Sequence, residues 1–357
     1  MQNTMTPILK LADFCNFDCG FCRYAQSGEG SPLMSLDIAE TAILDTAQHN
    51  LDMGARVAHI IFHGGEPLLW GKERFRKIHE VELAFCEKNP GFRFFNSIQT
   101  NGYLIDREWA HIFSEMEMDV GISHDGPSDL NSHFGRCGCT DISKVVELLE
   151  DSTVRHGILS VITNAHRGRA KDYYNFLIAS SIRSAGLCYC FDPDGKNTVR
   201  NDNLASFLIE LFDLYFYGDY ELDVREFENA ILGVLGKDIP SCCNKCRSIC
   251  GNHFTVLPNG DMQFCDSYDV AGERSGNITV DGIDGYLKSS RYKNTLLQLR
   301  KNYDRHCSRC EVLEVCRGGC FRNDIEDGRN CFCDAYKALY MHVKAVVQQA
   351  NTNCMNE

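Results

Sequence analysis

The sequence predicts an α/β fold, a partial (β/α)6 barrel followed by a smaller cysteine-rich domain. Three observations lead to this prediction. Six short apolar runs are typical of buried strands, and helix-like stretches lie between them. The composition and periodicity of the sequence change near residue 235. Alternating strands and helices indicate parallel βαβ units, and six of these form most of a TIM-like barrel. In such barrels the chemistry lies at the carboxyl ends of the strands.

Each expected strand is a short apolar run, and most of them end in Gly, Asn or Asp, residues typical of turns. The expected strands are residues 7–12, 59–65, 95–101, 120–126, 159–165 and 186–193. The helix-like stretches are residues 35–51, 72–88, 105–116, 141–152 and 171–185. Because helices connect successive strands, the strands should run parallel to one another.

From about residue 235 onward, cysteine, glycine and asparagine become frequent and regular periodicity falls. Residues 253–268 resemble a hairpin with P-N-G-D as its turn, and residues 334–350 form an amphipathic pattern typical of a helix. We therefore expect a barrel domain over residues 1–234 and a cysteine-rich domain over residues 235–357.

The composition narrows the classes of protein to consider. The chain has 357 residues, 20 cysteines and a formal net charge of −13. The acidic balance argues against nucleic-acid binding, and no apolar run is long enough to span a membrane. The N-terminus has no signal-peptide pattern, so we expect a cytoplasmic protein whose cysteines bind metal rather than form disulfides. Because the chain starts almost at its first strand, we expect no N-terminal leader-recognition domain.

Three cysteines follow the first expected strand in the order C-x3-C-x2-C. They are Cys15, Cys19 and Cys22, with no fourth cysteine close by. A closed zinc site needs four ligands, and a cubane iron–sulfur cluster normally binds four thiolates. Three thiolates hold three irons of a cubane and leave the fourth iron open to an outside ligand. The alternatives are a zinc knuckle or unrelated thiols.

This motif resembles the radical SAM family, in which the open iron binds the amino and carboxylate groups of S-adenosylmethionine (SAM). One electron from the cluster then releases a 5′-deoxyadenosyl radical. The stretch H-G-G-E-P at the second strand matches the family's SAM motif, and S-I-Q-T-N-G and G-I-S-H-D-G-P match at the third and fourth strands. The resemblance implies SAM contacts from Phe21, Gly64, Gly65, Glu66, Pro67, Ser123 and Arg136. Taken alone, G-G-E-P is better explained by an ordinary strand-to-helix turn.

The later cysteines resemble the SPASM extension of radical SAM enzymes, which holds two auxiliary [4Fe–4S] clusters. One segment has the spacing C-x9-G-x4-C, and another has C-x2-C-x5-C-x3-C followed by a further cysteine. The resemblance assigns the outer cluster to Cys307, Cys310, Cys316 and Cys333, with Cys331 as an alternative to Cys333. It assigns the inner cluster to Cys250, Cys265 and Cys320 with a fourth ligand from upstream.

The fourth inner ligand is where this chain departs from the pattern. The family has a cysteine six residues before the position of Cys250, and here that residue is Asn244. Cys242, Cys243 and Cys246 all lie nearby, and we expect the ligand to be Cys243 or Cys246.

Similarity to anaerobic sulfatase maturases runs over nearly the whole chain. Those enzymes convert a Cys or Ser of a sulfatase into formylglycine. The resemblance implies that Asp266, in C-D-x-Y, is a catalytic base, and that Tyr24 faces the active site. One departure is His63, because sulfatase maturases typically have Gln before G-G-E-P. His63 resembles maturases of ribosomal peptides that form cyclophanes or other side-chain cross-links.

The sequence therefore favours a radical SAM/SPASM enzyme that abstracts a Cβ hydrogen from a ribosomal peptide and forms a cross-link such as a cyclophane or thioether. Formylglycine formation is the first alternative. An iron–sulfur electron-transfer protein is the second, and SAM cleavage would exclude it. The expected cofactors are SAM and three [4Fe–4S] clusters, and the expected partners are a peptide or protein substrate and a reductant such as flavodoxin or ferredoxin.

Overall fold

The computed structural model describes residues 4–19, 22, 32–133, 140–192, 198–237, 250–266, 274–324 and 327–355. The chain divides into two compact units. The first comprises residues 1–123, 134–156 and 250–297, and the second comprises residues 124–133, 157–249 and 298–357. The domain boundary expected near residue 235 depends on the change in composition and periodicity alone and stays a prediction.

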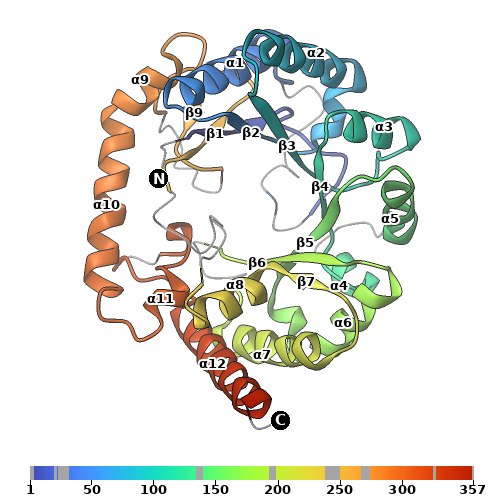
Figure 1. Ribbon diagram of the computed structural model, residues 1–357, viewed down its shortest axis with the longest axis vertical. Coiled ribbons are helices and arrows are strands. Elements are labelled where there is room, and N and C mark those ends of the chain that lie inside the picture. Colours follow the sequence, from blue (N-terminus) through green and yellow to red (C-terminus); the bar gives the residue numbers. More distant parts are fainter. Residues whose placement is uncertain are drawn as a thin grey trace. The chain divides into compact units, whose positions relative to one another are not determined.

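The first unit contains a sheet in the order β4-β3-β2-β1-β8-β9 (Figure 1). Its strands are β1 (Thr6–Lys10), β2 (Val57–His63), β3 (Arg93–Thr100), β4 (Asp119–Ser123), β8 (His253–Val256) and β9 (Met262–Gln263). The pairs β1/β2, β2/β3, β3/β4 and β1/β8 are parallel, and β8/β9 is antiparallel. The predicted hairpin is therefore present, but its first strand also extends the parallel sheet beside β1, which the sequence did not predict.

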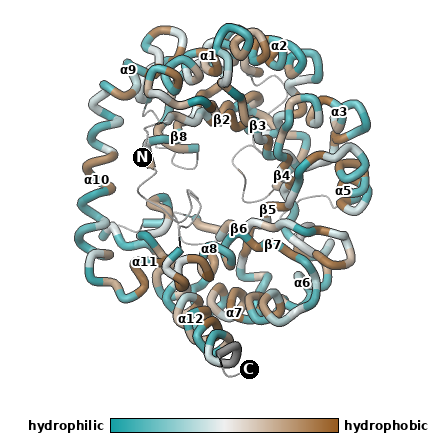
Figure 2. Tube along the Cα trace, viewed as in Figure 1, coloured by the Kyte–Doolittle hydropathy of each residue, from teal (hydrophilic) through white to brown (hydrophobic). Residues whose placement is uncertain are grey.

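Helices cover one side of these strands (Figure 1). They are α1 (Leu36–Asp52), η2 (Pro67–Trp70), α2 (Lys72–Lys88), α3 (Arg107–Glu115), α5 (Ile142–Asp151) and α9 (Gly282–Lys288). Alternate residues of β2 face them, and Ala58, Ile60 and Phe62 are fully buried. The Phe62 ring packs edge-on against Phe75 of α2, with centroids 5.1 Å apart. The hydrophobic residues along β2 and β3 are shown in Figure 2. Because the core takes up one side of β1 to β4, the other side is available for polar residues.

The second unit contains the parallel strands β5 (His156–Ile162), β6 (Ser184–Tyr189) and β7 (Asp223–Val224), with His156 itself in the first unit. Its helices are α4 (Ser128–His133), η3 (Asn164–His166), α6 (Ala170–Ala179), α7 (Asn201–Tyr217), α8 (Arg225–Val234), α11 (Leu313–Cys316), η5 (Phe321–Asn323) and α12 (Cys333–Met355). Helix α10 (Ser290–His306) is divided between the units after Leu297.

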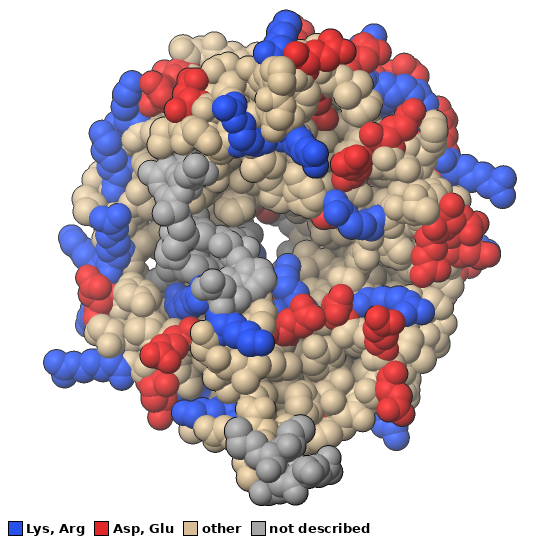
Figure 3. Space-filling model, in the orientation of Figure 1, with Lys and Arg blue, Asp and Glu red and all other residues tan. Residues whose placement is uncertain are grey.

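All six predicted strands are present, and each begins and ends slightly earlier than expected because the turn residues at its carboxyl end lie outside the ladder. The helix expected over residues 171–185 was too long. It ends at Ala179, Ser181 takes a left-handed conformation with φ of 55°, and β6 begins at Ser184. Among the described residues, no helix is both long and apolar enough to cross a membrane. Acidic and basic side chains are interspersed over the face drawn in Figure 3.

Candidate functional site

The segment that carries the three-cysteine motif leaves the end of β1 and runs beside the G-G-E-P segment. The amide of Gly65 donates to the carbonyl of Ala12 at 2.8 Å, and the amide of Glu66 donates to the carbonyl of Phe14 at 3.0 Å. A Cβ atom on Gly65 would lie 2.0 Å from the Phe14 carbonyl oxygen, closer than any real contact. The glycine is therefore required for the backbone that precedes Cys15 to pack here.

The cysteine segment is also held from β3. The Asn101 side chain donates to Asn16 Oδ1 at 2.8 Å and to Cys15 Sγ at 3.7 Å, and the amide of Phe17 donates to the same sulfur at 3.3 Å. Burial raises the pKa of the Cys15 thiol to about 11. A buried thiol of this kind suits a metal, which binds the thiolate and replaces its proton.

Glu66 lies at the centre of this arrangement and is fully buried. Its Oε1 accepts from the Leu68 amide at 3.0 Å and from Thr100 Oγ1 at 2.7 Å, and its Oε2 accepts from the Asn101 amide at 2.9 Å. Burial raises the pKa of this carboxyl to about 7. The carboxylate thus joins the carboxyl ends of β2 and β3, and its predicted contact with SAM stays a prediction.

The end of β4 completes the polar edge. Ser123 is the last residue of β4, and its hydroxyl accepts a 2.8 Å hydrogen bond from the side-chain amide of Gln99 on β3. Glu66, Asn101 and Ser123 therefore all lie at the carboxyl ends of neighbouring parallel strands, as expected for a barrel site.

A second cluster joins β1, β2 and the residue after Cys265. Lys10 forms an ion pair with Asp266, and its ammonium lies 3.4 Å from Nδ1 of His63. Lys10 and His63 are register partners at the ends of β1 and β2. His63 Nε2 lies 4.0 Å from Asp266 Oδ2. The sequence analysis missed Lys10, although a lysine within the apolar run P-I-L-K-L-A was a signal that could have revealed it.

The tautomer of His63 follows from its neighbours. Nδ1 faces two donors, the Gly64 amide at 2.8 Å and the Lys10 ammonium at 3.4 Å, and one acceptor, the Gly64 carbonyl at 3.2 Å. The two donors favour the tautomer in which Nδ1 accepts and Nε2 carries the hydrogen. An N–H donor and a carboxylate acceptor thus stand side by side, which suits a substrate that both donates and accepts a hydrogen bond.

The four cysteines of the expected outer cluster lie together in the second unit. Burial raises the pKa of the Cys316 thiol to about 12, and the nearby charges of Cys333, Cys307 and Cys310 raise it further. A metal cluster would bind these cysteines as thiolates and replace their protons. Cys331 lies close enough to Cys333 for their charges to interact, but the thiolates that act on Cys316 are those of the other three cysteines. The choice of Cys333 over Cys331 as the ligand stays a prediction.

The Cys331–Cys333 segment is positioned by Asn201 at the start of α7. The Asn201 side chain donates to the Cys331 carbonyl at 2.7 Å and accepts from the Ala335 amide at 3.1 Å. Farther along α12, His342 Nε2 lies 2.6 Å from Asp213 Oδ1 of α7. These contacts fix the start of α12 and with it the position of Cys333.

The other predicted site residues fall into two groups, those in the described part of the chain and those outside it. Cys250 and Cys265 belong to the first unit and Cys320 to the second. Phe21, Tyr24, Arg136, Cys243 and Cys246 lie outside the described residues. Within the described ranges, no group of three or more His, Cys, Asp or Glu side chains is arranged to hold a single metal ion.

Two family models match this chain. The model of the radical SAM superfamily matches residues 9–167, and that of an iron–sulfur cluster-binding domain, SPASM, matches residues 237–311. A cysteine-type anaerobic sulfatase-maturating enzyme of Clostridium perfringens is 28% identical over 91% of this chain and 92% of that protein. A serine-type anaerobic sulfatase-maturating enzyme of Bacteroides thetaiotaomicron is 23% identical over 96% of this chain and 90% of that protein.

Solved structures agree with these matches. Native anSMEcpe with bound AdoMet and Cp18Cys peptide has a TM-score of 0.82 at 25% identity, over 98% of this chain and 99% of that chain. Streptococcus suis SuiB bound to S-adenosylmethionine has a TM-score of 0.64 at 17% identity, over 93% of this chain and 77% of that chain, which supports the fold alone. The predicted partial (β/α)6 barrel is confirmed.

Proposed function

The chain is a radical SAM enzyme with a SPASM domain, and from this premise we propose that it matures a sulfatase-like protein by oxidising a cysteine or serine to formylglycine. SAM and iron–sulfur clusters are its cofactors. The sequence analysis ranked cross-linking first, and this order is now reversed. Sulfatase-maturating relatives match more than nine-tenths of the chain, whereas the preference for cross-linking depended on His63 alone.

The observation that carries the proposal is the group formed by Lys10, His63 and Asp266. When bound, SAM and the clusters supply a radical that removes a hydrogen atom from the substrate Cβ and a sink for the second electron. The chain must then remove one proton from the substrate thiol or hydroxyl. The Asp266 carboxylate accepts this proton. A serine then becomes the aldehyde directly, whereas a cysteine becomes a thioaldehyde, which water converts to the aldehyde with release of hydrogen sulfide.

Lys10 and His63 serve that step by position. Lys10 is only 2% exposed, and its ammonium holds the Asp266 carboxylate in one orientation. The Nε2 hydrogen of His63 lies beside the same carboxylate and donates to the substrate oxygen or sulfur while Asp266 takes the proton. This arrangement orients the substrate side chain before the bond to hydrogen breaks.

For the remaining predicted residues we propose the roles that the family resemblance implies. Cys15, Cys19 and Cys22 hold the SAM-binding cluster, and Gly64, Gly65 and Pro67 shape the backbone next to it. Glu66 and Ser123 line the SAM site from the ends of β2 and β4. Cys307, Cys310, Cys316 and Cys333 hold the outer auxiliary cluster, and Cys250, Cys265 and Cys320 hold the inner one with Cys243 or Cys246. A flavodoxin or ferredoxin supplies the electron.

Mass spectrometry of anaerobic turnovers tests this proposal. The holoenzyme is given SAM, a reductant and one of three peptides that differ only at the target residue, which is Cys, Ser or Ala. We expect an aldehyde, trapped by a hydrazide, from the Cys or Ser peptide and no product from the Ala peptide.

Two other outcomes contradict the proposal. Loss of two hydrogens without aldehyde reactivity, from any peptide supplied, indicates a cross-linking maturase. Failure to form 5′-deoxyadenosine under every condition indicates an electron-transfer protein. An Asp266→Asn variant is the matched control, because it should still cleave SAM while the aldehyde disappears.

A further inference from the structure

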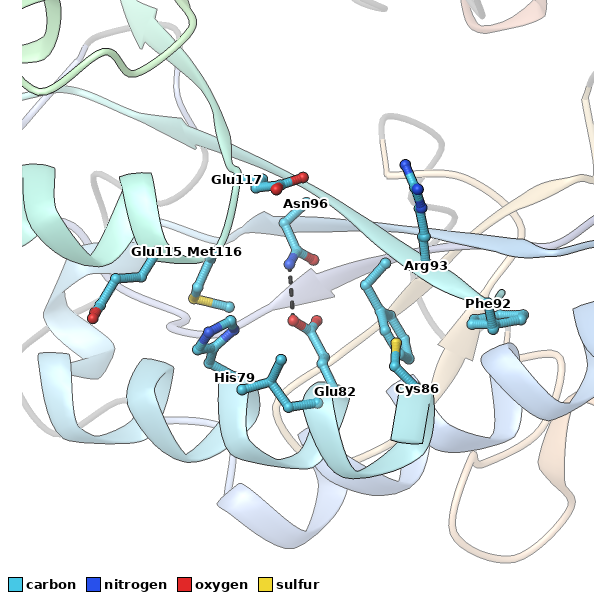
Figure 4. A pocket seen from close by; sticks show the side chains of 11 residues that line it. His79, Glu82, Cys86, Phe92, Arg93, Asn96, Glu115, Met116 and Glu117 are labelled. Carbon is cyan, nitrogen blue, oxygen red and sulfur yellow. Dashed lines mark hydrogen bonds between the residues drawn. The ribbon is translucent and has the colours of Figure 1, made fainter. Parts of the chain in front are cut away.

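A cavity of about 420 Å³ lies on the helix-covered side of the first unit, away from the polar edge described above. It is formed by the second half of α2, the start of β3 and the end of α3 (Figure 4). His79, Glu82, Leu83 and Cys86 of α2 line it from one face of the helix, because residues three and four apart lie side by side. The cavity is therefore separate from the Lys10, His63 and Asp266 group, which lies at the opposite end of the strands.

A carboxylate stands where the fold would ordinarily place an apolar side chain. The buried residues of α2 are Phe75, Ile78, Glu82 and Phe85, so Glu82 occupies the apolar face of the helix. Asn96 on β3 faces it, and both are almost completely buried, at 4% and 1% exposed. Burying a carboxyl group and an amide is costly unless their hydrogen bonds are satisfied.

Their hydrogen bonds are only half satisfied. Asn96 Nδ2 donates to Glu82 Oε2 at 2.9 Å, and Figure 4 shows the two side chains pointing toward each other across the cavity wall. Among the residues that the structure describes, Glu82 Oε1, Asn96 Oδ1 and His79 Nδ1 have no hydrogen-bond partner. Such atoms are rare in proteins. When the Glu82 carboxyl is ionised, its Oε1 and the neighbouring Asn96 Oδ1 can both accept from a donor in the cavity.

The rest of the lining describes the ligand. Glu115 and Glu117 add two carboxylates, against one guanidinium from Arg93, so the lining favours a cation. The side chains of Leu83, Phe92, Phe94 and Met116 supply apolar surface. Because this apolar surface adjoins the carboxylates, the lining favours an organic cation over a metal ion.

We propose that this cavity binds a ligand with an ammonium group on an apolar stem, whose ammonium donates to Glu82 Oε1 and Asn96 Oδ1. The stem packs on Phe94, Leu83 and Met116. Such a group occurs in free amines and in the lysine side chains of proteins, and both present the same chemistry to the cavity. The inference does not depend on the reaction at the other end of the strands.

Calorimetric titration of the anaerobic holoenzyme tests it with matched probes. Phenethylammonium represents a free amine, Nα-acetyl-lysine amide represents a lysine side chain, and 2-phenylethanol has the shape of the first probe without its charge. We expect at least one ammonium probe to bind and the alcohol to bind about tenfold more weakly, since hydrogen bonds to a charged group are among the strong ones. The probe that binds more tightly identifies the source.

Two variants assign the binding to this cavity. At about pH 9, where the Glu82 carboxyl is ionised, Glu82→Gln keeps the shape and the bond to Asn96 but removes the charge, and it should weaken the ammonium probe by about tenfold. Glu117→Gln changes an exposed carboxylate on the rim and should weaken it by about threefold at most. Full iron content shows that each variant is folded. Absence of binding by both ammonium probes, or equal binding to wild type and Glu82→Gln, overturns the inference.

Discussion

Lys10, the last residue of β1, forms an ion pair with Asp266, the residue that follows Cys265. The lysine is buried and the aspartate is about one-fifth exposed. An ion pair of this kind fixes the direction of a carboxylate that otherwise follows a short strand of only two residues, β9.

Replacing Lys10 by Met should lower peptide oxidation by about 10- to 100-fold, because a misdirected Asp266 no longer meets the substrate proton. Cleavage of SAM should continue, so the ratio of 5′-deoxyadenosine to modified peptide rises. The measurement is quantification of both products in one anaerobic turnover. Lys72→Met is the matched control, since Lys72 pairs with Asp106 and Glu108 away from the site. An unchanged ratio in Lys10→Met would show that the pair does not position the base.

Gly65→Ala should prevent the SAM-binding cluster from assembling, because the added Cβ would meet the Phe14 carbonyl just before Cys15. Iron analysis after anaerobic reconstitution should show a loss of about four irons per chain, together with loss of SAM cleavage. Gly71→Ala is the control. Gly71 has φ of 96° and ψ of 145°, a conformation used almost only by glycine, but an added Cβ there would have no neighbouring atom within 4 Å, so alanine costs about 1–3 kcal/mol of stability. It should keep full iron, and equal iron in the two variants would refute the packing argument.

Cys333→Ser should lose the outer auxiliary cluster, whereas Cys331→Ser should keep it. The reason is that the charges of Cys333, Cys307 and Cys310 act on Cys316. Iron and sulfide analysis should show about four fewer irons in the first variant only. The opposite result would make Cys331 the ligand.

Sequence patterns were sufficient where chemistry requires particular residues at a short spacing. The motif of Cys15, Cys19 and Cys22 and the glycine before Glu66 are of this kind, and apolar runs located strands β1 to β6. The pair of Lys10 and Asp266 could not be predicted, because parallel pairing of β8 with β1 brings together residues that are far apart in the chain.

The same limit applies to Glu82 and Asn96. Hydrophobic periodicity predicted helix α2 correctly over residues 72–88, but it averages over the face and does not reveal that one buried position carries a carboxylate. The partner on β3 becomes visible only when the helix packs on the sheet. Buried polar pairs between elements therefore require the three-dimensional structure.

Glu82 should make the stability of the protein depend on pH. Burial raises the pKa of its carboxyl from 4.5 to about 8, and the hydrogen bond from Asn96 offsets only part of this rise. Below pH 4.5 the group is protonated in both states. Between the two pKa values it is ionised only in the unfolded chain, so the stability present at low pH is lost as the pH rises, by about 1.4 kcal/mol per pH unit.

Comparison of wild type with Glu82→Gln isolates this effect, because glutamine does not titrate. Thermal unfolding at about pH 6 and about pH 8 should show the melting temperature of the wild type falling by several degrees relative to the variant. Glu117→Gln serves as a control for loss of a carboxylate at an exposed position. A constant difference between wild type and Glu82→Gln over this range would mean that Glu82 is ionised in the folded protein. In that case a cation already balances its charge.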